Sequence, residues 1–224
     1  MSIVLIGPPA AGKTRAGKRL SQRLHATFAD TDKLFAREHG AIAEFIPRHG
    51  EAEFRRIERE IVARAVTEYD IVSLGGGAIL DERTQHDLAA PEHTVVLLVA
   101  SPAAIEERIA GRKNRPLLTG IDSWIATYEA RKPIYDRLAD IRVDTSFRPM
   151  WQVVVEIRRH LKRLDSPLVR RPHSGHANGP AEARPTGDEA AAERAKHTAE
   201  AIDRIHASTR PDAAQPSTTK EPRS

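Results

Sequence analysis

Up to residue 165, short apolar runs alternate with longer stretches in which apolar residues recur every three or four positions. Several of the runs are β-branched or leucine-rich without polar alternation, which favours strands buried on both faces. The predicted strands are Ser2–Ile6, Thr27–Ala29, Ile71–Leu74, Thr94–Val99 and Ile141–Val143. Helical spacing is clearest in residues 51–67 and 151–164, and this alternation predicts a parallel sheet with helices on both faces.

The pattern changes after Asp165. Residues 166–224 show little apolar periodicity, and the first part of this stretch is rich in Pro, Gly, Ser and His. Residues 188–208 combine alanine with charged residues, which favours a short helix capped by Asp188. We therefore predict a globular domain over residues 1–165 and a low-complexity, largely disordered C-terminal tail over residues 166–224.

The composition narrows the functional classes. The chain contains no cysteine, which excludes disulfides, thiolate metal sites and a cysteine nucleophile. No apolar run approaches the roughly 20 residues of a membrane helix, and the N-terminus lacks the charged region of a signal peptide. We expect a cytoplasmic protein without a membrane partner. The net charge is +4, aromatic residues make up 4% of the chain, and the charges are mixed in sign, which does not favour nucleic-acid binding.

Residues 7–14, GPPAAGKT, match the phosphate-binding pattern G-x-x-x-x-G-K-[ST]. A predicted strand precedes the motif, and a helical stretch follows it with Ala16, Leu20 and Leu24 on one face. In this context backbone N–H groups and the helix N-terminus surround the phosphates of ATP. The lysine reaches the β- and γ-phosphates, and the hydroxyl ligates Mg²⁺. The predicted ATP-binding residues are Gly7, Pro8, Pro9, Ala10, Ala11, Gly12, Lys13 and Thr14, of which Lys13 is also catalytic and Thr14 also a metal ligand.

Two carboxylates, Asp30 and Asp32, follow the second predicted strand. Because parallel sheets bind ligands beyond the carboxyl ends of their strands, we expect both side chains in the same crevice as the phosphates. One carboxylate suits the metal shell, and the other suits a substrate hydroxyl. The third predicted strand ends in glycines instead of the aspartate that usually serves Mg²⁺ in such proteins, so Asp30 is the predicted metal ligand.

Three consecutive glycines, Gly75 to Gly77, end that third strand. A triple glycine is entropically costly unless a ligand or another group must approach the backbone closely. We therefore interpret this turn as part of a substrate site.

Several arginines are candidates for binding anions. Arg55 precedes Glu58 by three positions in a helical stretch, so the two side chains share one face. Arg115 lies in residues 111–120, a basic segment between two glycines, which is typical of a mobile lid over phosphates. Taken singly, Arg55, Arg115 and Arg131 also fit ordinary surface arginines.

The motifs GPPAAGKT, ADTD, GEAEFRRIE, SLGGGA, RPLL and ARKPIY occur in an order and at a spacing that resemble the shikimate kinases, a family of P-loop enzymes similar to nucleoside-monophosphate kinases. The resemblance covers about residues 1–164. It implies an α/β, three-layer P-loop kinase fold with a five-stranded parallel sheet and a mobile lid. It also implies a transferase that uses ATP and Mg²⁺ to convert shikimate to shikimate 3-phosphate, a step of chorismate and aromatic amino acid biosynthesis.

The resemblance assigns roles to single residues. Arg55 and Arg131 hold the shikimate carboxylate, and Glu58 orients Arg55. Asp32 binds ring hydroxyls and is the base for the attacking 3-hydroxyl. The remaining implied roles are hydroxyl binding by the N–H groups of Gly76 and Gly77, catalysis on the transferring phosphoryl group by Arg115, adenine-side contacts by Arg108 and Arg148, and Mg²⁺ binding by Thr14 and Asp30.

Some positions depart from the family pattern. Ala10 stands where the family usually has glycine, which predicts an α- or β-region backbone there instead of a positive φ. Arg15 stands where a second small hydroxyl residue is common. Phe45-Ile46 reverses the usual Ile-Phe, so we expect an aliphatic wall in the substrate pocket, with Pro47 tightening a turn beside it.

Two other interpretations stay open. The chain could be a different small-molecule P-loop kinase, acting on gluconate or a nucleotide, or an ATP-dependent switch or scaffold without catalysis. The triple glycine with two arginines disfavours a nucleotide acceptor, and the complete set Lys13, Thr14, Asp30, Asp32 and Arg115 disfavours a switch. We expect the enzyme to act as a monomer.

Overall fold

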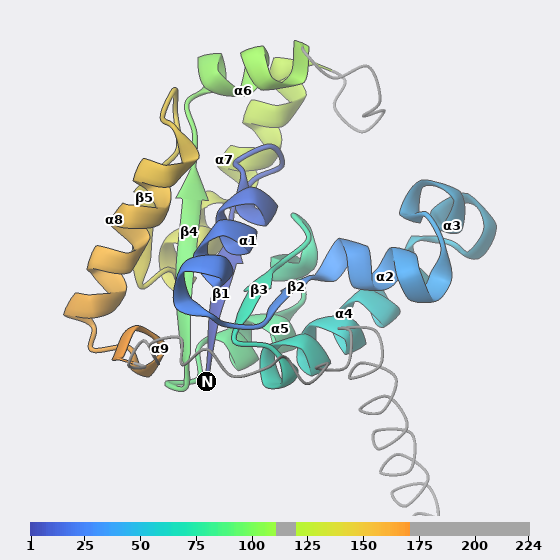
Figure 1. The fold of residues 1–224 in the computed structure, drawn as a ribbon. Helices are drawn as coiled ribbons and strands as arrows, with labels where there is room; N and C mark the ends of the chain where they lie inside the picture. Colours follow the sequence, from blue (N-terminus) through green and yellow to red (C-terminus); the bar gives the residue numbers. More distant parts are fainter. Residues whose placement is uncertain (111–119, 171–224) are drawn as a thin grey trace, which may run out of the picture. The chain divides into compact units, whose positions relative to one another are not determined.

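The computed structural model describes residues 1–110 and 120–170. Their centre is a parallel sheet in the strand order β2-β3-β1-β4-β5 (Figure 1). The strands are β1 (Ser2–Ile6), β2 (Phe28–Asp30), β3 (Ile71–Ser73), β4 (His93–Val99) and β5 (Ile141–Asp144). Each lies within a residue or two of its predicted position, and the predicted fold class is confirmed.

Strand β1 is the centre of the sheet. It pairs with β3 on one side, where Ile3 lies opposite Ile71, and with β4 on the other, where Ile3 lies opposite Thr94. All five residues of β1 are buried. Because both faces of this strand are covered, its sequence carries no polar alternation.

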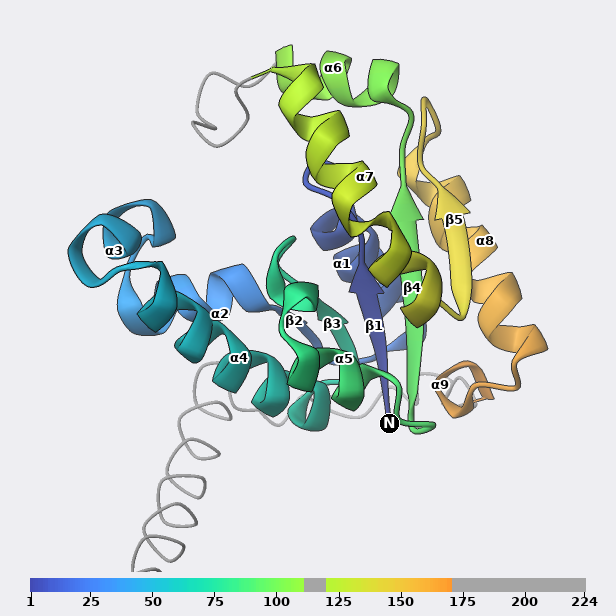
Figure 2. The same ribbon diagram turned by 180° about the vertical axis from the view of Figure 1, so that it is seen from behind.

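The helices are α1 (Lys13–Leu24), α2 (Thr31–His39), α3 (Ile42–His49), α4 (Glu51–Glu68), α5 (Glu82–Leu88), α6 (Pro102–Ala110), α7 (Ile121–Leu138), α8 (Met150–Arg163) and α9 (Pro167–Arg170), with a 3₁₀ turn, η1 (Ala78–Leu80). The helices predicted at 51–67 and 151–164 are α4 and α8. Figure 1 shows α1 and α8 on one face of the sheet, and Figure 2 shows α4, α5 and α7 on the other.

The turn expected at Pro47 is wrong, because Pro47 lies inside α3. Three apolar side chains at helical spacing, Ile42, Phe45 and Ile46, pack against the core on the α4 side of the sheet. This packing outweighs the one backbone hydrogen bond that a proline removes from a helix.

Alternate residues of β1 pack in two separate hydrophobic cores, one on each face of the sheet. Val4 and Ile6 of β1 pack against α4 and α7, whereas Ile3 and Leu5 pack against α1 and α8. This alternation gives the three-layer arrangement of helices, sheet and helices.

The carboxyl ends of three neighbouring strands carry the predicted site. The loop 7–12 follows β1, Asp30 ends β2, and Gly75 to Gly77 follow β3. Because β2, β3 and β1 are adjacent and parallel, these segments meet at one edge of the sheet.

Ordered structure extends past the predicted domain boundary at residue 165. Leu168 of α9 is only 4% exposed and packs in the core formed with α1 and α8. The predicted lid with Arg115 and most of the predicted tail, including its helix at 188–208, lie outside the described residues. Among the described helices, none is both long and apolar enough to span a membrane.

Candidate active site

The phosphate-binding loop connects β1 to α1. Gly7 has a φ of 137°, and a Cβ at this position would lie 2.2 Å from the carbonyl oxygen of Leu98, so only glycine fits. The Lys13 ammonium donates hydrogen bonds to the carbonyls of Gly7 (2.7 Å) and Pro8 (3.1 Å). No side chain caps the N-terminus of α1 at Gly12. The first N–H groups of this helix are therefore suited to bind an anion.

Ala10 corrects one prediction from the sequence. Its φ is 62°, in the left-handed region, and not in the α or β region expected for alanine. Such a conformation costs a non-glycine residue about 1–2 kcal/mol. The left-handed backbone is therefore adopted here without a glycine, and contacts from the surrounding structure must offset the strain.

Side-chain donors form hydrogen bonds with the carbonyls of three consecutive loop residues. The indole N–H of Trp124 donates to the Pro9 carbonyl at 2.9 Å. Nη1 of Arg108 donates to the Ala10 carbonyl at 3.1 Å. The hydroxyl of Thr145 shares its single proton between the carbonyls of Ala11 and Val99, both at 3.0 Å. The three donors come from α7, from α6 and from the end of β5.

Thr14 and Asp30 meet directly. The Thr14 hydroxyl donates to Oδ2 of Asp30 at 2.5 Å, and Oδ1 of Asp30 accepts from the backbone N–H of Lys33 at 3.2 Å. Asp30 is 8% exposed. The structure thus brings together the hydroxyl and the carboxylate that the sequence predicts as ligands of Mg²⁺, and hard oxygen donors of this kind suit that ion.

Among the described residues no cluster of three or more His, Cys, Asp or Glu side chains could hold a metal by itself. Mg²⁺ does not need such a cluster, because it is usually held by one or two protein oxygens together with substrate phosphates and water.

The triple glycine lies against charged side chains. A Cβ placed on Gly75 would lie 2.5 Å from Oδ1 of Asp32 and 2.9 Å from Oε1 of Glu58. A Cβ on Gly77 would lie 2.5 Å from Nη1 of Arg55. The expected close approach of other groups to the backbone is therefore observed at Gly75 and Gly77.

Arg131 of α7 approaches the same turn. Its Nη1 donates to the carbonyl of Gly76 at 2.8 Å. A Cβ on Gly76 would lie 3.5 Å from Cγ of Pro9 and 3.6 Å from Nη1 of Arg131. The phosphate-binding loop and the predicted substrate residues are therefore direct neighbours.

Arg55 is held by two carboxylates. Its Nη1 donates to Glu58 at 2.7 Å and its Nη2 donates to Glu51 at 3.1 Å, while its guanidinium lies 5.0 Å from the ring centre of Phe54. Burial raises the pKa of Glu58, and the neighbouring Asp32 adds to this effect, whereas Arg55 opposes it. A buried carboxylate next to an arginine in a crevice is typical of a functional site.

Arg108 and Arg148, predicted on the adenine side, both donate to the backbone where β5 ends, at Thr145 and Asp144. Arg108 donates to the hydroxyl of Thr145 at 3.2 Å and also to its carbonyl. Arg148 donates to the carbonyl of Asp144 at 2.9 Å and pairs with Glu156 at 2.7 Å. Their adenine contacts stay a prediction.

Sequence reasoning missed three residues of this site. Trp124 and Thr145 donate to the phosphate-binding loop, and the Thr31 hydroxyl accepts the N–H of Gly75 at 2.9 Å. Thr31 lies between the two predicted aspartates, which was a usable signal. Trp124 and Thr145 carry no local pattern, because their contacts are with Pro9 and Ala11, more than 100 residues away.

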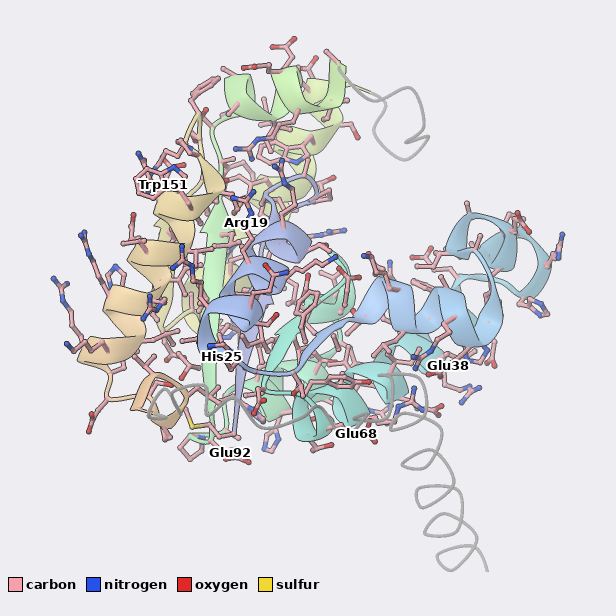
Figure 3. All side chains as sticks on the ribbon, in the orientation of Figure 1. Arg19, His25, Glu38, Glu68, Glu92 and Trp151 are labelled. Atoms are coloured by element: carbon pink, nitrogen blue, oxygen red, sulfur yellow. The ribbon has the colours of Figure 1, made fainter. Side chains whose placement is uncertain are left out.

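A cavity of about 420 Å³ lies elsewhere, between α1 and α8. Figure 3 labels Arg19 of α1 and Trp151 of α8 from its lining. None of the predicted site residues lines this cavity, so its position does not argue for the predicted chemistry.

Comparisons with known proteins identify the family of this chain. A family model for shikimate kinase matches residues 9–162. The shikimate kinase of Corynebacterium efficiens is 40% identical over 164 residues, covering 71% of this chain and 96% of the relative. That of Mycobacterium avium is 43% identical over 168 residues, covering 73% and 94%.

A solved structure of the Acinetobacter baumannii shikimate kinase in complex with shikimate is 27% identical. It has a TM-score of 0.67 and covers 74% of this chain and 94% of its own. The match to the family model covers the phosphate-binding loop from Pro9 onward, the triple glycine and Arg131, and the chain therefore belongs to the shikimate kinase family.

Proposed function

We propose that this enzyme transfers the γ-phosphoryl group of ATP to the 3-hydroxyl of shikimate, giving shikimate 3-phosphate and ADP. The carrying observation is that Asp32, Arg55 and Arg131 converge on the triple glycine, beside Pro9 of the phosphate-binding loop. Two cations and one carboxylate next to a phosphate site suit a small hydroxylated carboxylate as acceptor.

Arg55 and Arg131 hold the carboxylate of shikimate, because a guanidinium offers a planar fork of donors to such a group. Glu58 and the Gly76 carbonyl already fix the two arginines, so little side-chain freedom is lost on binding. This arrangement directs the ring of the substrate toward Asp32 and the phosphate-binding loop.

Asp32 accepts the proton of the 3-hydroxyl as the oxygen attacks the γ-phosphorus. The bond from the γ-phosphorus to the bridging oxygen breaks, and ADP leaves. Lys13 and the N-terminus of α1 stabilise the negative charge on the phosphates. In this family of reactions catalysis rests mainly on positioning and charge neutralisation, which these groups supply.

Mg²⁺ fits at Thr14 and Asp30, where a hydroxyl and a buried carboxylate already lie within 2.5 Å of each other. When bound, the ion neutralises charge on the transferring phosphates. We also infer that Arg115 contacts the transferring group and that Arg108 and Arg148 contact adenine. The monomeric state and the cytoplasmic location stay predictions.

Truncation of either carboxylate-binding arginine tests the substrate assignment. Arg55→Ala and Arg131→Ala each remove a charge-assisted hydrogen bond worth about 1.5–3 kcal/mol. We expect the KM for shikimate to rise roughly 10- to 150-fold in initial-rate kinetics, with a much smaller change in the KM for ATP.

Each variant has a matched control on its own helix. Arg56 of α4 pairs with Glu53 and with the exposed Glu60, and Arg137 of α7 donates to Gln85. Arg56→Ala and Arg137→Ala should leave the KM for shikimate nearly unchanged. An unchanged KM in both Arg55→Ala and Arg131→Ala would contradict the assignment.

A further inference from the structure

The phosphate-binding loop is held from outside by side chains of three different elements. Trp124, Arg108 and Thr145 donate to the carbonyls of three consecutive residues, Pro9 to Ala11. The described residues contain no cis peptide bond. In a trans peptide, the C=O and the N–H of the next residue point in opposite directions. Fixing the carbonyls of Pro9 to Ala11 therefore also fixes the N–H groups of Ala10, Ala11 and Gly12.

The indole of Trp124 is an independent part of this arrangement. Arg108 and Thr145 are hydrogen-bonded to each other, so their effects on the loop are coupled. For the Pro9 carbonyl, the donor identified among the described residues is Trp124. A flip of this peptide would turn the next N–H, that of Ala10, away from its present direction.

Trp124 is itself rigidly placed. It is 1% exposed, packs with Ala100 and Ile105, and stacks on Tyr128 with ring centres 5.5 Å apart at an interplanar angle of 11°. Ala10 packs against the same cluster. The indole therefore acts as a fixed donor. The strained residue, Ala10, directly follows Pro9, whose carbonyl the indole holds.

We propose that Trp124 is a positioning residue for ATP binding. It holds the Pro9 carbonyl and thereby keeps the loop in the conformation that places Ala10 at a positive φ. The inference rests on the proposed use of ATP by this loop. It assigns to Trp124 no contact with either substrate. Its effect belongs to nucleotide binding and not to shikimate binding.

The first test removes the donor and keeps the ring. Trp124→Phe lacks the indole N–H, and the loss of one neutral hydrogen bond corresponds to a roughly 2- to 13-fold weaker interaction. We expect the Kd for ADP with Mg²⁺, measured by isothermal titration calorimetry without shikimate, to rise within that range. The KM for shikimate should change less than twofold.

The second test separates positioning from packing. Glycine adopts a positive φ without strain, so Ala10→Gly no longer needs the indole to hold the loop. We expect Ala10→Gly with Trp124→Phe to bind ADP more tightly than Trp124→Phe alone and to restore most of the lost affinity. A double variant as weak as Trp124→Phe alone would overturn the proposal, as would an unchanged Kd in Trp124→Phe.

A third measurement keeps Trp124 in place. The other tryptophan, Trp151, is 58% exposed on α8 (Figure 3), so Trp151→Phe leaves Trp124 as the only indole fluorophore. Addition of ADP with Mg²⁺ should change its emission, because the loop it bonds to contacts the phosphates. An emission spectrum that is unaltered at saturating ADP would overturn the proposal even if Trp124→Phe fails to fold.

The outcomes also separate this proposal from the proposed function. Wild-type enzyme that binds no ADP would contradict the proposed function. Wild-type enzyme that binds ADP, together with Trp124→Phe of equal affinity, would contradict only the role of Trp124.

Discussion

Glu58 shows how the site uses a charge that folding disfavours. The side chain is 7% exposed, and burial raises its pKa, yet its carboxylate bonds to Arg55 at 2.7 Å. A buried ionised group is retained where it has a task. The task proposed here is to orient Arg55 beside the triple glycine.

The raised pKa predicts a pH dependence of stability. Folding favours the neutral form of this carboxyl, so its contribution is fully present below its unfolded pKa and is lost as the pH rises through the higher folded pKa. Glu58→Gln does not titrate. The difference in Tm, wild type minus Glu58→Gln, should therefore fall as the pH is raised from about 4 toward neutrality. A difference that grows over this range in thermal unfolding would show that the pKa is lowered instead.

The backbone conformation of Ala10 could not be predicted from the residues next to it in the sequence. An alanine disfavours a positive φ by itself, and the sequence therefore predicts an α- or β-region backbone. The observed φ of 62° occurs in a loop whose carbonyls bond to Trp124, Arg108 and Thr145, all remote in sequence. By contrast, the Arg55–Glu58 pair is predictable, because both residues lie on one helix at a spacing of three.

At the scale of elements, two helices and one turn form the proposed substrate site. Helix α4 brings Arg55 and Glu58, α7 brings Arg131, and the turn after β3 offers a backbone without side chains. The motifs predict each part separately. Their contact is a consequence of strand order, since α4 and α7 cover the same face of the sheet (Figure 2).

The turn predicts different outcomes for neighbouring glycines. A Cβ at Gly75 would lie 2.5 Å from Asp32 and 2.9 Å from Glu58, whereas a Cβ at Gly76 would make ordinary contacts of 3.5 Å and 3.6 Å. Displacement of reacting groups by about 1 Å costs roughly 10²-fold in rate. We expect Gly75→Ala to lower kcat on this scale and Gly76→Ala to retain activity within several-fold. Equal loss in both variants would show that the turn needs flexibility and not space beside Gly75.

At the scale of the whole molecule, the apolar pattern predicts which segments are strands but not which strands are neighbours. Continuous apolar runs indicate burial on both faces, and Ser2–Ile6 is predicted to the residue. The order β2-β3-β1-β4-β5 arises from long-range pairing, for example of Ile3 with Ile71. The helices within residues 31–49 were not predicted separately. Ile42, Phe45 and Ile46 of α3 do stand at helical spacing, but Pro47 also indicates a turn.

The most direct test of the central claim is a coupled assay of ADP release with purified enzyme, ATP and Mg²⁺. Shikimate, gluconate and nucleoside monophosphates are offered in parallel as acceptors. The two arginines and Asp32 around the triple glycine predict rapid turnover with shikimate alone, and the product should be phosphorylated at the 3-hydroxyl. Faster ADP release with gluconate or a nucleoside monophosphate than with shikimate would contradict this account.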